Sequence, residues 1–213
     1  MKLLVSDLYK KFLDNKITNK IFLLGIDGCG GAGKSTLAQS FKEVGGNNVT
    51  IIHMDDFYKP SGIRKQVSNN EIGGNWDYER VKKQVLEPLR NNQKTKYQRY
   101  DWNIDDMAEW HDLPTEGLVV IEGCYSLVKS LNNYYNFKIW VESPKELRLS
   151  RGIERDGEEN RHLWEDLWMP AEEQYIREQQ PLKTVDLIVD GTGKESDIKN
   201  LELTVLKVPY SWN

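Results

Sequence analysis

The chain of 213 residues is 38% hydrophobic, and its 29 Lys and Arg nearly balance its 33 Asp and Glu. This length suits either one domain or a domain with an appended lid. The charged residues form no basic stripe, which argues against binding to nucleic acid. The longest apolar runs, residues 21–26 and 118–121, are too short for a membrane span, and residues 1–16 carry charges that a signal peptide lacks. We therefore expect a cytoplasmic protein without nucleic-acid or membrane partners, and the sequence leaves a homo-oligomer open.

The two cysteines, Cys29 and Cys124, form no C-x-x-C pair, and the three histidines are too far apart for metal-ligand spacing. A disulfide framework or a zinc site needs closer and more regular spacing than this. The sequence therefore predicts two small buried thiols and neither kind of site.

Taken in chain order, residues 3–13 predict a helix on the outside of the domain. Five apolar runs then alternate with longer helical stretches: residues 20–27, 48–55, 117–123, 137–142 and 185–191. Such alternation is typical of an α/β domain whose parallel sheet is covered by helices on both faces. We expect a P-loop NTPase fold with a five-stranded parallel sheet in one domain over residues 1–213. Acidic residues would lie near the carboxyl ends of its strands, the edge where such sheets bind ligands: Asp27, Asp55, Glu122, Glu142 and Asp190.

Residues 25–36, GIDGCGGAGKST, fit two phosphate-binding patterns. Gly28, Gly30 and Gly33 match the dinucleotide pattern G-x-G-x-x-G, and Asp55 even supplies the acidic residue that this pattern needs about twenty positions later. The mononucleotide pattern G-x-x-x-x-G-K-[ST] also uses the lysine, which reaches the β- and γ-phosphates, and the hydroxyl, which binds Mg²⁺. We therefore predict that residues 28–36, here called the phosphate loop, bind ATP or GTP: Gly28, Cys29, Gly30, Gly31, Ala32, Gly33, Lys34, Ser35 and Thr36.

Three helices have readable boundaries. Residues 36–46 end at two glycines, and residues 77–89 begin at Asp77 as N-cap and carry apolar residues at helical spacing. In residues 143–156, we expect Ser143 as N-cap, with Glu146 completing a capping box. Residues 91–117 predict a long irregular region at the ligand edge, and we expect this substrate-binding insertion to carry specificity.

Carboxylates beside the phosphate loop would serve Mg²⁺ and the acceptor hydroxyl. Asp55 and Asp56 are neighbours after the second strand, so that one faces the phosphates and the other faces away. Glu122 ends a buried strand, where a second Mg²⁺-linked carboxylate is expected. The predicted metal ligands are Ser35, Asp55 and Glu122.

Arg148, Arg151 and Arg155 share one helix face, and Arg161 follows. A phosphoryl-transfer enzyme needs such cations to offset the charge of the migrating group. The alternative is that nearby glutamates pair with these arginines in weak surface ion pairs.

Seven segments in order over residues 21–192 resemble the uridine kinase and phosphoribulokinase family of P-loop kinases: GIDGCGGAGKSTLA, DDFYKP, NWDYER, YDW, VVIEG, RGIERDGEENR and DLIVDGT. The resemblance implies a mobile arginine-bearing lid, about residues 148–165, and phosphorylation of a small-molecule hydroxyl by ATP or GTP with Mg²⁺. The implied acceptor is the 5′-hydroxyl of a nucleoside such as uridine. The implied catalytic residues are Lys34, Asp55, Glu122 and Arg155, with Asp55 as general base. Arg151 would bind the nucleotide, and the implied substrate contacts are Tyr58, Asp77, Tyr100 and Arg161.

Two departures from the family pattern keep the acceptor open. Asp105 and Asp106 stand where uridine kinases place a pyrimidine-reading histidine, and His162 follows Arg161 where a glycine is usual. Nicotinamide riboside, pantothenate, a sugar or a sugar acid are alternative acceptors, and Tyr100 and Trp102 have hairpin packing as an alternative role. A regulatory NTPase is a further alternative, although the chain lacks N-K-x-D and L-S-G-G-Q motifs.

Overall fold

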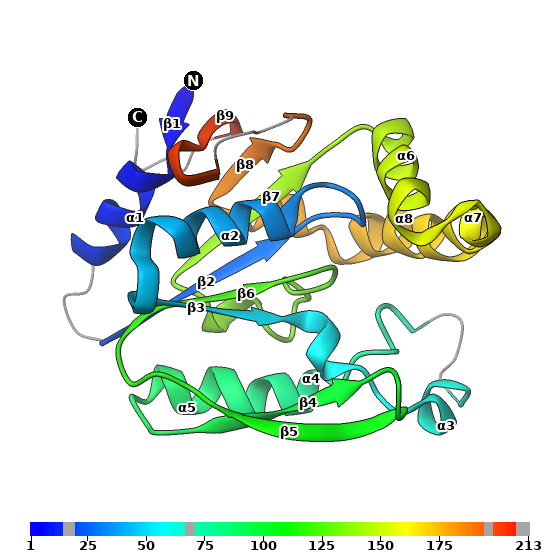
Figure 1. Cartoon of the computed structure of the whole chain (residues 1–213), viewed down its shortest axis with the longest axis horizontal. Helices are drawn as coiled ribbons and strands as arrows, with labels where there is room; N and C mark the ends of the chain where they lie inside the picture. Colours follow the sequence, from blue (N-terminus) through cyan, green and yellow to red (C-terminus); the bar gives the residue numbers. More distant parts are fainter. Residues whose placement is uncertain (15–19, 67–70, 194–197, 208–213) are drawn as a thin grey trace.

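A computed structural model describes residues 1–14, 20–66, 71–193 and 198–207. Its centre is a seven-stranded sheet of order β1-β9-β8-β7-β2-β6-β3 (Figure 1). The strands are β1 (Lys2–Leu4), β2 (Ile21–Asp27), β3 (Val49–His53), β6 (Gly117–Glu122), β7 (Phe137–Glu142), β8 (Leu187–Asp190) and β9 (Glu202–Lys207).

The five predicted strands are confirmed, and they form the parallel part of the sheet, from β8 through β7, β2 and β6 to β3. The prediction of five strands in all was wrong, because β9 pairs antiparallel with β8, and β1 pairs antiparallel with β9. Strand β1 has only three residues and β9 is half exposed, so neither shows the apolar run that identifies a buried parallel strand.

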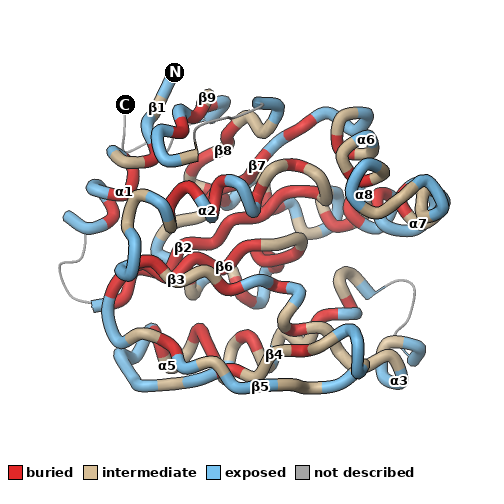
Figure 2. Tube along the Cα trace, viewed as in Figure 1, coloured by how far each residue is buried: buried red, intermediate tan, exposed pale blue. Residues whose placement is uncertain are grey.

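Two hydrophobic clusters lie on opposite faces of the sheet, since successive side chains of a strand point to opposite sides. Helices α1 (Val5–Asp14) and α2 (Lys34–Gly45) cover one face. The helix of residues 78–90 and helix α8 (Met169–Gln179) cover the other. Figure 2 shows the buried strands between these two layers. The prediction of helices on both faces is therefore confirmed.

The helix of residues 78–90 starts where the sequence predicted it. Asp77 Oδ1 accepts a hydrogen bond from the backbone N–H of Arg80 at 3.1 Å, as an N-cap does. The helix consists of α4 (Tyr78–Arg80), a π-helical stretch (Val81–Leu86) and α5 (Glu87–Arg90). Its predicted apolar positions are all buried: Val81, Val85, Leu86 and Leu89.

Two local predictions were wrong. The region of residues 91–117 contains an antiparallel hairpin of β4 (Lys96–Asp101) and β5 (Asp106–Asp112), whose polar, half-exposed strands carry no clear apolar alternation. Ser143 is not the N-cap of α6 (Lys145–Asp156), because its hydroxyl donates to the carbonyl of Ala32 at 3.2 Å instead. The hydroxyl thus binds the phosphate loop, a partner 111 positions away that local sequence does not indicate.

The remaining helices are α3 (Ser61–Arg64), α6 and α7 (Arg161–Leu163), and a π-helical turn (Trp164–Trp168) leads from α7 into α8. None of the described helices has the length and apolar character that crossing a bilayer requires.

Asp27 ends β2 and is fully buried. Oδ1 accepts from the backbone N–H groups of Gly28 at 2.7 Å and Tyr125 at 3.1 Å. Oδ2 accepts from the N–H of Leu127 at 2.9 Å and from the Tyr175 hydroxyl at 2.7 Å. This carboxylate therefore ties the phosphate loop, the segment after β6 and helix α8 together. Burial raises the pKa of Asp27 to about 6, although the hydrogen bonds act in the opposite direction.

We predict that Asp27→Asn lowers the free energy of unfolding by about 2 kcal/mol, because an amide leaves some of these buried donors unpaired. The loss is expected to depend on pH. Between the ordinary pKa of 3.8 and the folded-state value of about 6, the folded protein binds the proton more tightly than the unfolded chain, so stability falls as pH rises. Urea unfolding should therefore show a larger difference between wild type and Asp27→Asn at pH 5 than at pH 7.5. An equal difference at the two pH values would contradict this account.

Candidate active site

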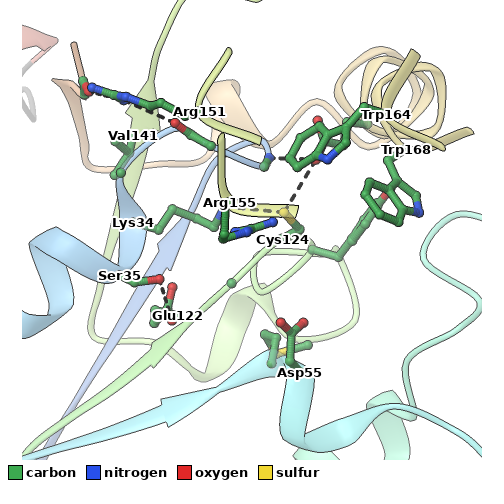
Figure 3. A pocket seen from close by; sticks show the side chains of 18 of the residues that line it. Lys34, Ser35, Asp55, Glu122, Cys124, Val141, Arg151, Arg155, Trp164 and Trp168 are labelled. Carbon is green, nitrogen blue, oxygen red and sulfur yellow. Dashed lines mark hydrogen bonds between the residues drawn. The ribbon is translucent and has the colours of Figure 1, made fainter. Parts of the chain in front are cut away.

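A cavity of about 1560 Å³ opens at the carboxyl edge of the parallel strands. Its walls come from the phosphate loop, from the segments that follow β3 and β6, and from the lid and α8 (Figure 3). The edge of the sheet that was predicted to bind ligands therefore contains a cavity. This cavity is large enough for a nucleotide and a second small molecule together.

The phosphate loop follows β2 and leads directly into α2, as predicted. Gly33 has φ +102°, a left-handed conformation that favours glycine, and Leu37 N bonds to its carbonyl at the start of the helix. The Lys34 ammonium lies inside the cavity wall, where Nζ donates to the Cys29 carbonyl at 2.9 Å and to Cys124 Sγ at 3.3 Å. Both cysteines are free. Because the loop precedes a helix N-terminus, its remaining amides form a site suited to an anion.

Burial by itself lowers the pKa of Lys34, but the acidic groups around the amine outweigh this effect and raise the pKa above its ordinary value. Cys124 contributes most to this rise in pKa, and Glu172, Glu122 and Asp27 follow in that order. Lys34 therefore stays positively charged, as a ligand of terminal phosphates must.

Glu122 lies beside the first turn of α2. Its Oε1 accepts from the Ser35 hydroxyl at 3.1 Å and lies 2.6 Å from His53 Nδ1. The hydrogen bond to Glu122 raises the pKa of His53. The predicted pair of Ser35 and Glu122 is thus brought together, whereas His53 is a neighbour that the sequence did not indicate.

Asp55 and Asp56 lie in a short 3₁₀ helix (Met54–Phe57), so the extended segment that the prediction assumed was wrong, but only one of the two side chains lines the cavity. Asp55 lines the cavity, whereas Asp56 accepts a hydrogen bond from the Tyr97 hydroxyl at 2.9 Å behind the wall. Asp55 is open to the solvent of the cavity, but desolvation by the surrounding protein and then the nearby charge of Glu122 raise its pKa. A carboxylate with a raised pKa is suited to accept a proton from a hydroxyl.

The opposite end of the cavity is aromatic. Tyr58 lies 4.4 Å from Trp76 and 4.5 Å from Trp102, measured between ring centroids, and Trp76 lies 4.7 Å from Tyr125. The Arg64 guanidinium lies 4.7 Å from the centre of the Trp102 ring. All five side chains line the cavity, so a flat or apolar part of a ligand would find stacking surfaces there.

Three predicted substrate contacts do not line this cavity: Asp77, Tyr100 and Arg161. Tyr100 is 1% exposed, and its hydroxyl donates to Asp105 at 2.6 Å and accepts from Arg64 at 3.2 Å. Its ring packs against Trp102, which agrees with the alternative of hairpin packing. Asp77 caps its helix and pairs with Arg80 at 3.4 Å.

The four arginines of the lid have different surroundings. Arg148 is buried in an ion pair, and Arg161 pairs on the surface with two glutamates, as the alternative reading proposed. Arg151 lines the cavity, but its guanidinium donates to the carbonyls of Gly31 at 3.1 Å and Gly191 at 2.8 Å. Arg155 also lines the cavity, 66% exposed, and pairs with Asp156 at 2.7 Å. Arg155 is therefore the lid arginine best placed to approach a phosphate.

Both ends of the lid pack directly on the phosphate loop. A Cβ at Gly31 would lie 2.6 Å from the carbonyl oxygen of Arg148, and one at Gly30 would lie 2.8 Å from the ring of Trp164. The sequence did not reveal Trp164 or Glu172 as neighbours of the loop, because the segment WEDLWMPAEEQY matches no phosphate-binding pattern. The P-loop pattern needs only Gly28 and Gly33. The additional glycines at positions 30 and 31 were the one sign in the sequence that another segment packs closely against the loop.

The fold and the site together define a P-loop phosphotransferase. A phosphate loop with its lysine and hydroxyl, a carboxylate beside the hydroxyl, and a second carboxylate facing the same cavity are the parts that phosphoryl transfer requires.

Comparison with known proteins identifies the family. The model of the phosphoribulokinase / uridine kinase family matches residues 23–196, and the chain belongs to this family. It is a kinase that transfers a phosphoryl group to the hydroxyl of a small molecule.

Individual relatives are distant. The chain is 25% identical to a uridine kinase from Chlamydia pneumoniae over 199 residues, covering 85% of this chain and 86% of that protein. It is 25% identical to a uridine kinase from Latilactobacillus sakei over 206 residues, covering 90% and 95%. A possible uridine kinase from Bacillus stearothermophilus shares the fold, with a TM-score of 0.64 and 23% identity over 86% of this chain and 96% of that chain.

We predict that Gly31→Ala weakens ATP binding at least tenfold, because the added methyl group meets the backbone of Arg148 and forces the lid away from the loop. Gly46→Ala is the matched control. Both glycines have positive φ, +74° and +56°, so each substitution strains the backbone, but nothing lies within 4 Å of a Cβ at Gly46. Calorimetric titration with ATP should therefore separate the two variants, and equal affinities would contradict this role of Gly31.

Proposed function

We propose that the protein phosphorylates the 5′-hydroxyl of a nucleoside, most simply uridine, with ATP or GTP as donor. The observation that carries this proposal is the continuity of the cavity from Lys34 and Ser35, past Asp55, to the aromatic residues Tyr58, Trp76 and Trp102. A donor phosphate on the loop and a ring among the aromatic side chains would place the connecting sugar hydroxyl beside Asp55. The uridine kinases among the relatives support the same acceptor.

The residues fit a nucleotide-bound Mg²⁺. Ser35 Oγ and Glu122 Oε1 are 3.1 Å apart, and Asp55 faces the same cavity. The described residues contain no group of three or more His, Cys, Asp or Glu that could hold an ion. Mg²⁺ on a nucleotide, however, takes phosphate oxygens and waters as most of its ligands. Bound there, the ion would offset the charge of the β- and γ-phosphates.

Each residue then has a distinct task. The loop amides and Lys34 bind the phosphates, and Arg155 neutralises charge on the transferred group. Asp55 accepts the proton of the acceptor hydroxyl as the oxygen attacks the γ-phosphorus, and ADP leaves. Tyr58 lines the part of the cavity that holds the acceptor. Arg151 supports the nucleotide site through its hydrogen bonds to the carbonyls of Gly31 and Gly191.

The tasks of Asp77, Tyr100 and Arg161 as substrate contacts stay predictions. None of the three lines the cavity: Asp77 caps its helix, Tyr100 is buried in the hairpin, and Arg161 lies on the surface of the lid. For Tyr100 and Arg161, a contact with substrate requires a movement of the hairpin or the lid when the ligands bind.

We predict that Asp55→Asn lowers kcat for transfer to the acceptor by 10²- to 10⁴-fold, the range that a positioned general base supplies. Asp56→Asn is the matched control, because the adjacent carboxylate bonds to Tyr97 and does not line the cavity. We expect it to retain kcat within a few-fold. Steady-state kinetics of both variants with the same acceptor test this, and near-wild-type transfer by Asp55→Asn would make the base assignment wrong.

The acceptor is identified by ADP release across a panel of nucleosides, riboside vitamins, pantothenate and sugar acids. We expect the highest kcat/KM with a pyrimidine nucleoside. If every nucleoside fails and another acceptor succeeds, the nucleoside proposal is wrong but kinase chemistry stands. If ADP release is equally fast without any acceptor, a regulatory NTPase is the better interpretation.

A further inference from the structure

An ion pair lies buried where the lid and helix α8 meet the phosphate loop. Arg148 Nη1 of α6 and Glu172 Oε2 of α8 are 3.0 Å apart, and their side chains are only 9% and 7% exposed. The free energy lost when two charged groups leave water exceeds the free energy gained from their attraction, unless further hydrogen bonds satisfy both groups. The other hydrogen bonds of Arg148 and Glu172 therefore indicate the role of the ion pair.

The other oxygen of Glu172 faces the phosphate loop. Oε1 accepts a hydrogen bond from the backbone N–H of Gly30 at 2.6 Å, and the Cys124 thiol lies 3.5 Å away as a weak donor. On the other side of the pair, Arg148 Nε donates to the Ser143 carbonyl at 3.1 Å. One carboxylate thus receives donors from the phosphate loop, from the segment after β6 and from the lid.

The backbone at Gly30 has room for this contact because it carries no side chain. A Cβ there would lie 3.1 Å from Glu172 Oε1 and 2.8 Å from the Trp164 ring. Gly30 and Gly31 are held between two helices: the Arg148 carbonyl of α6 approaches Gly31, and Glu172 of α8 accepts from the Gly30 N–H. This charge-assisted hydrogen bond is the direct polar link from α8 to the two glycines among the described residues.

We propose that Glu172 is a positioning residue for phosphoryl transfer, which acts through the Gly30 amide to fix the phosphate loop and through Arg148 to fix the lid. The loop amides then already point into the cavity before the nucleotide binds. The lid, which carries Arg155, is held in a fixed position over the cavity. Glu172 itself contacts no substrate in this account. The inference rests on the phosphoryl transfer of the proposed function, but it does not depend on which acceptor is used.

Three variants at the pair separate the amide contact from the ion pair. Glu172→Ala removes both interactions, and Glu172→Gln keeps an oxygen for Gly30 but loses the charge opposite Arg148. The double variant Glu172→Arg with Arg148→Glu restores opposite charges but offers the Gly30 amide no acceptor. Glu173→Gln is the matched control, because Glu173 also joins α8 to α6, through Lys145 at 2.7 Å, but on the surface at 51% and 53% exposure.

The experiment measures the dissociation constant of a fluorescent ATP analogue, and then KM for ATP and KM for the acceptor. We expect Glu173→Gln within twofold of wild type, Glu172→Gln several-fold weaker for ATP, and both Glu172→Ala and the double variant at least tenfold weaker. KM for the acceptor should change less than twofold. A residue that only stabilised the fold would lower the amount of active protein and leave KM for ATP unchanged.

Wild-type ATP affinity in the double variant would overturn the proposal, because the ion pair alone would then suffice. Equal affinities of Glu172→Gln and Glu173→Gln would also overturn it, and this comparison remains decisive if the double variant does not fold. Since ATP binding needs no acceptor, failure of the nucleoside proposal leaves the test intact. ATP binding that tracks the predicted order, with no transfer to any acceptor, would reject the proposed function alone.

Discussion

The site depends on one constraint. Around the turn between β2 and α2, neighbouring segments of backbone pack directly against each other. Gly31 lies against the carbonyl of Arg148, and Gly28 lies so close to Val141 that a Cβ would meet its carbonyl oxygen at 2.4 Å. Side chains cannot be accommodated there, so the loop can lie beneath the lid and still direct its amides into the cavity. The glycines therefore serve packing as well as anion binding.

This close packing divides the lid into two parts with different contacts. Arg148, Arg151 and Trp164 attach its inner surface to the loop, whereas Arg155 and Arg161 lie on its outer part. Arginines that share one helix face thus have different surroundings, because only some of them meet the loop. The buried carboxylate of Asp27 adds a further tie, because it joins the loop to the segment after β6 and to α8.

Much of the fold and the donor half of the site could be predicted from the sequence, because their signals are local. Buried parallel strands are short apolar runs, and the phosphate loop keeps its lysine and hydroxyl at fixed spacing. Predictions failed where a distant contact determined the outcome. Ser143 binds Ala32 rather than its own helix, and Glu172 meets Gly30 across 142 positions. The hairpin of residues 96–112 was missed because its strands are polar and half exposed.

One continuous cavity connects the phosphate loop, Asp55 and the aromatic residues, and we propose that a donor phosphate and an acceptor hydroxyl meet there at Asp55. Phosphorus NMR of the protein with ATP, Mg²⁺ and uridine follows the γ-phosphate to its product and so tests this meeting of donor and acceptor. The account predicts a phosphomonoester signal at the nucleoside 5′-oxygen that grows in step with ADP. Growth of inorganic phosphate in step with ADP, with no phosphomonoester from uridine or any other acceptor, would contradict it.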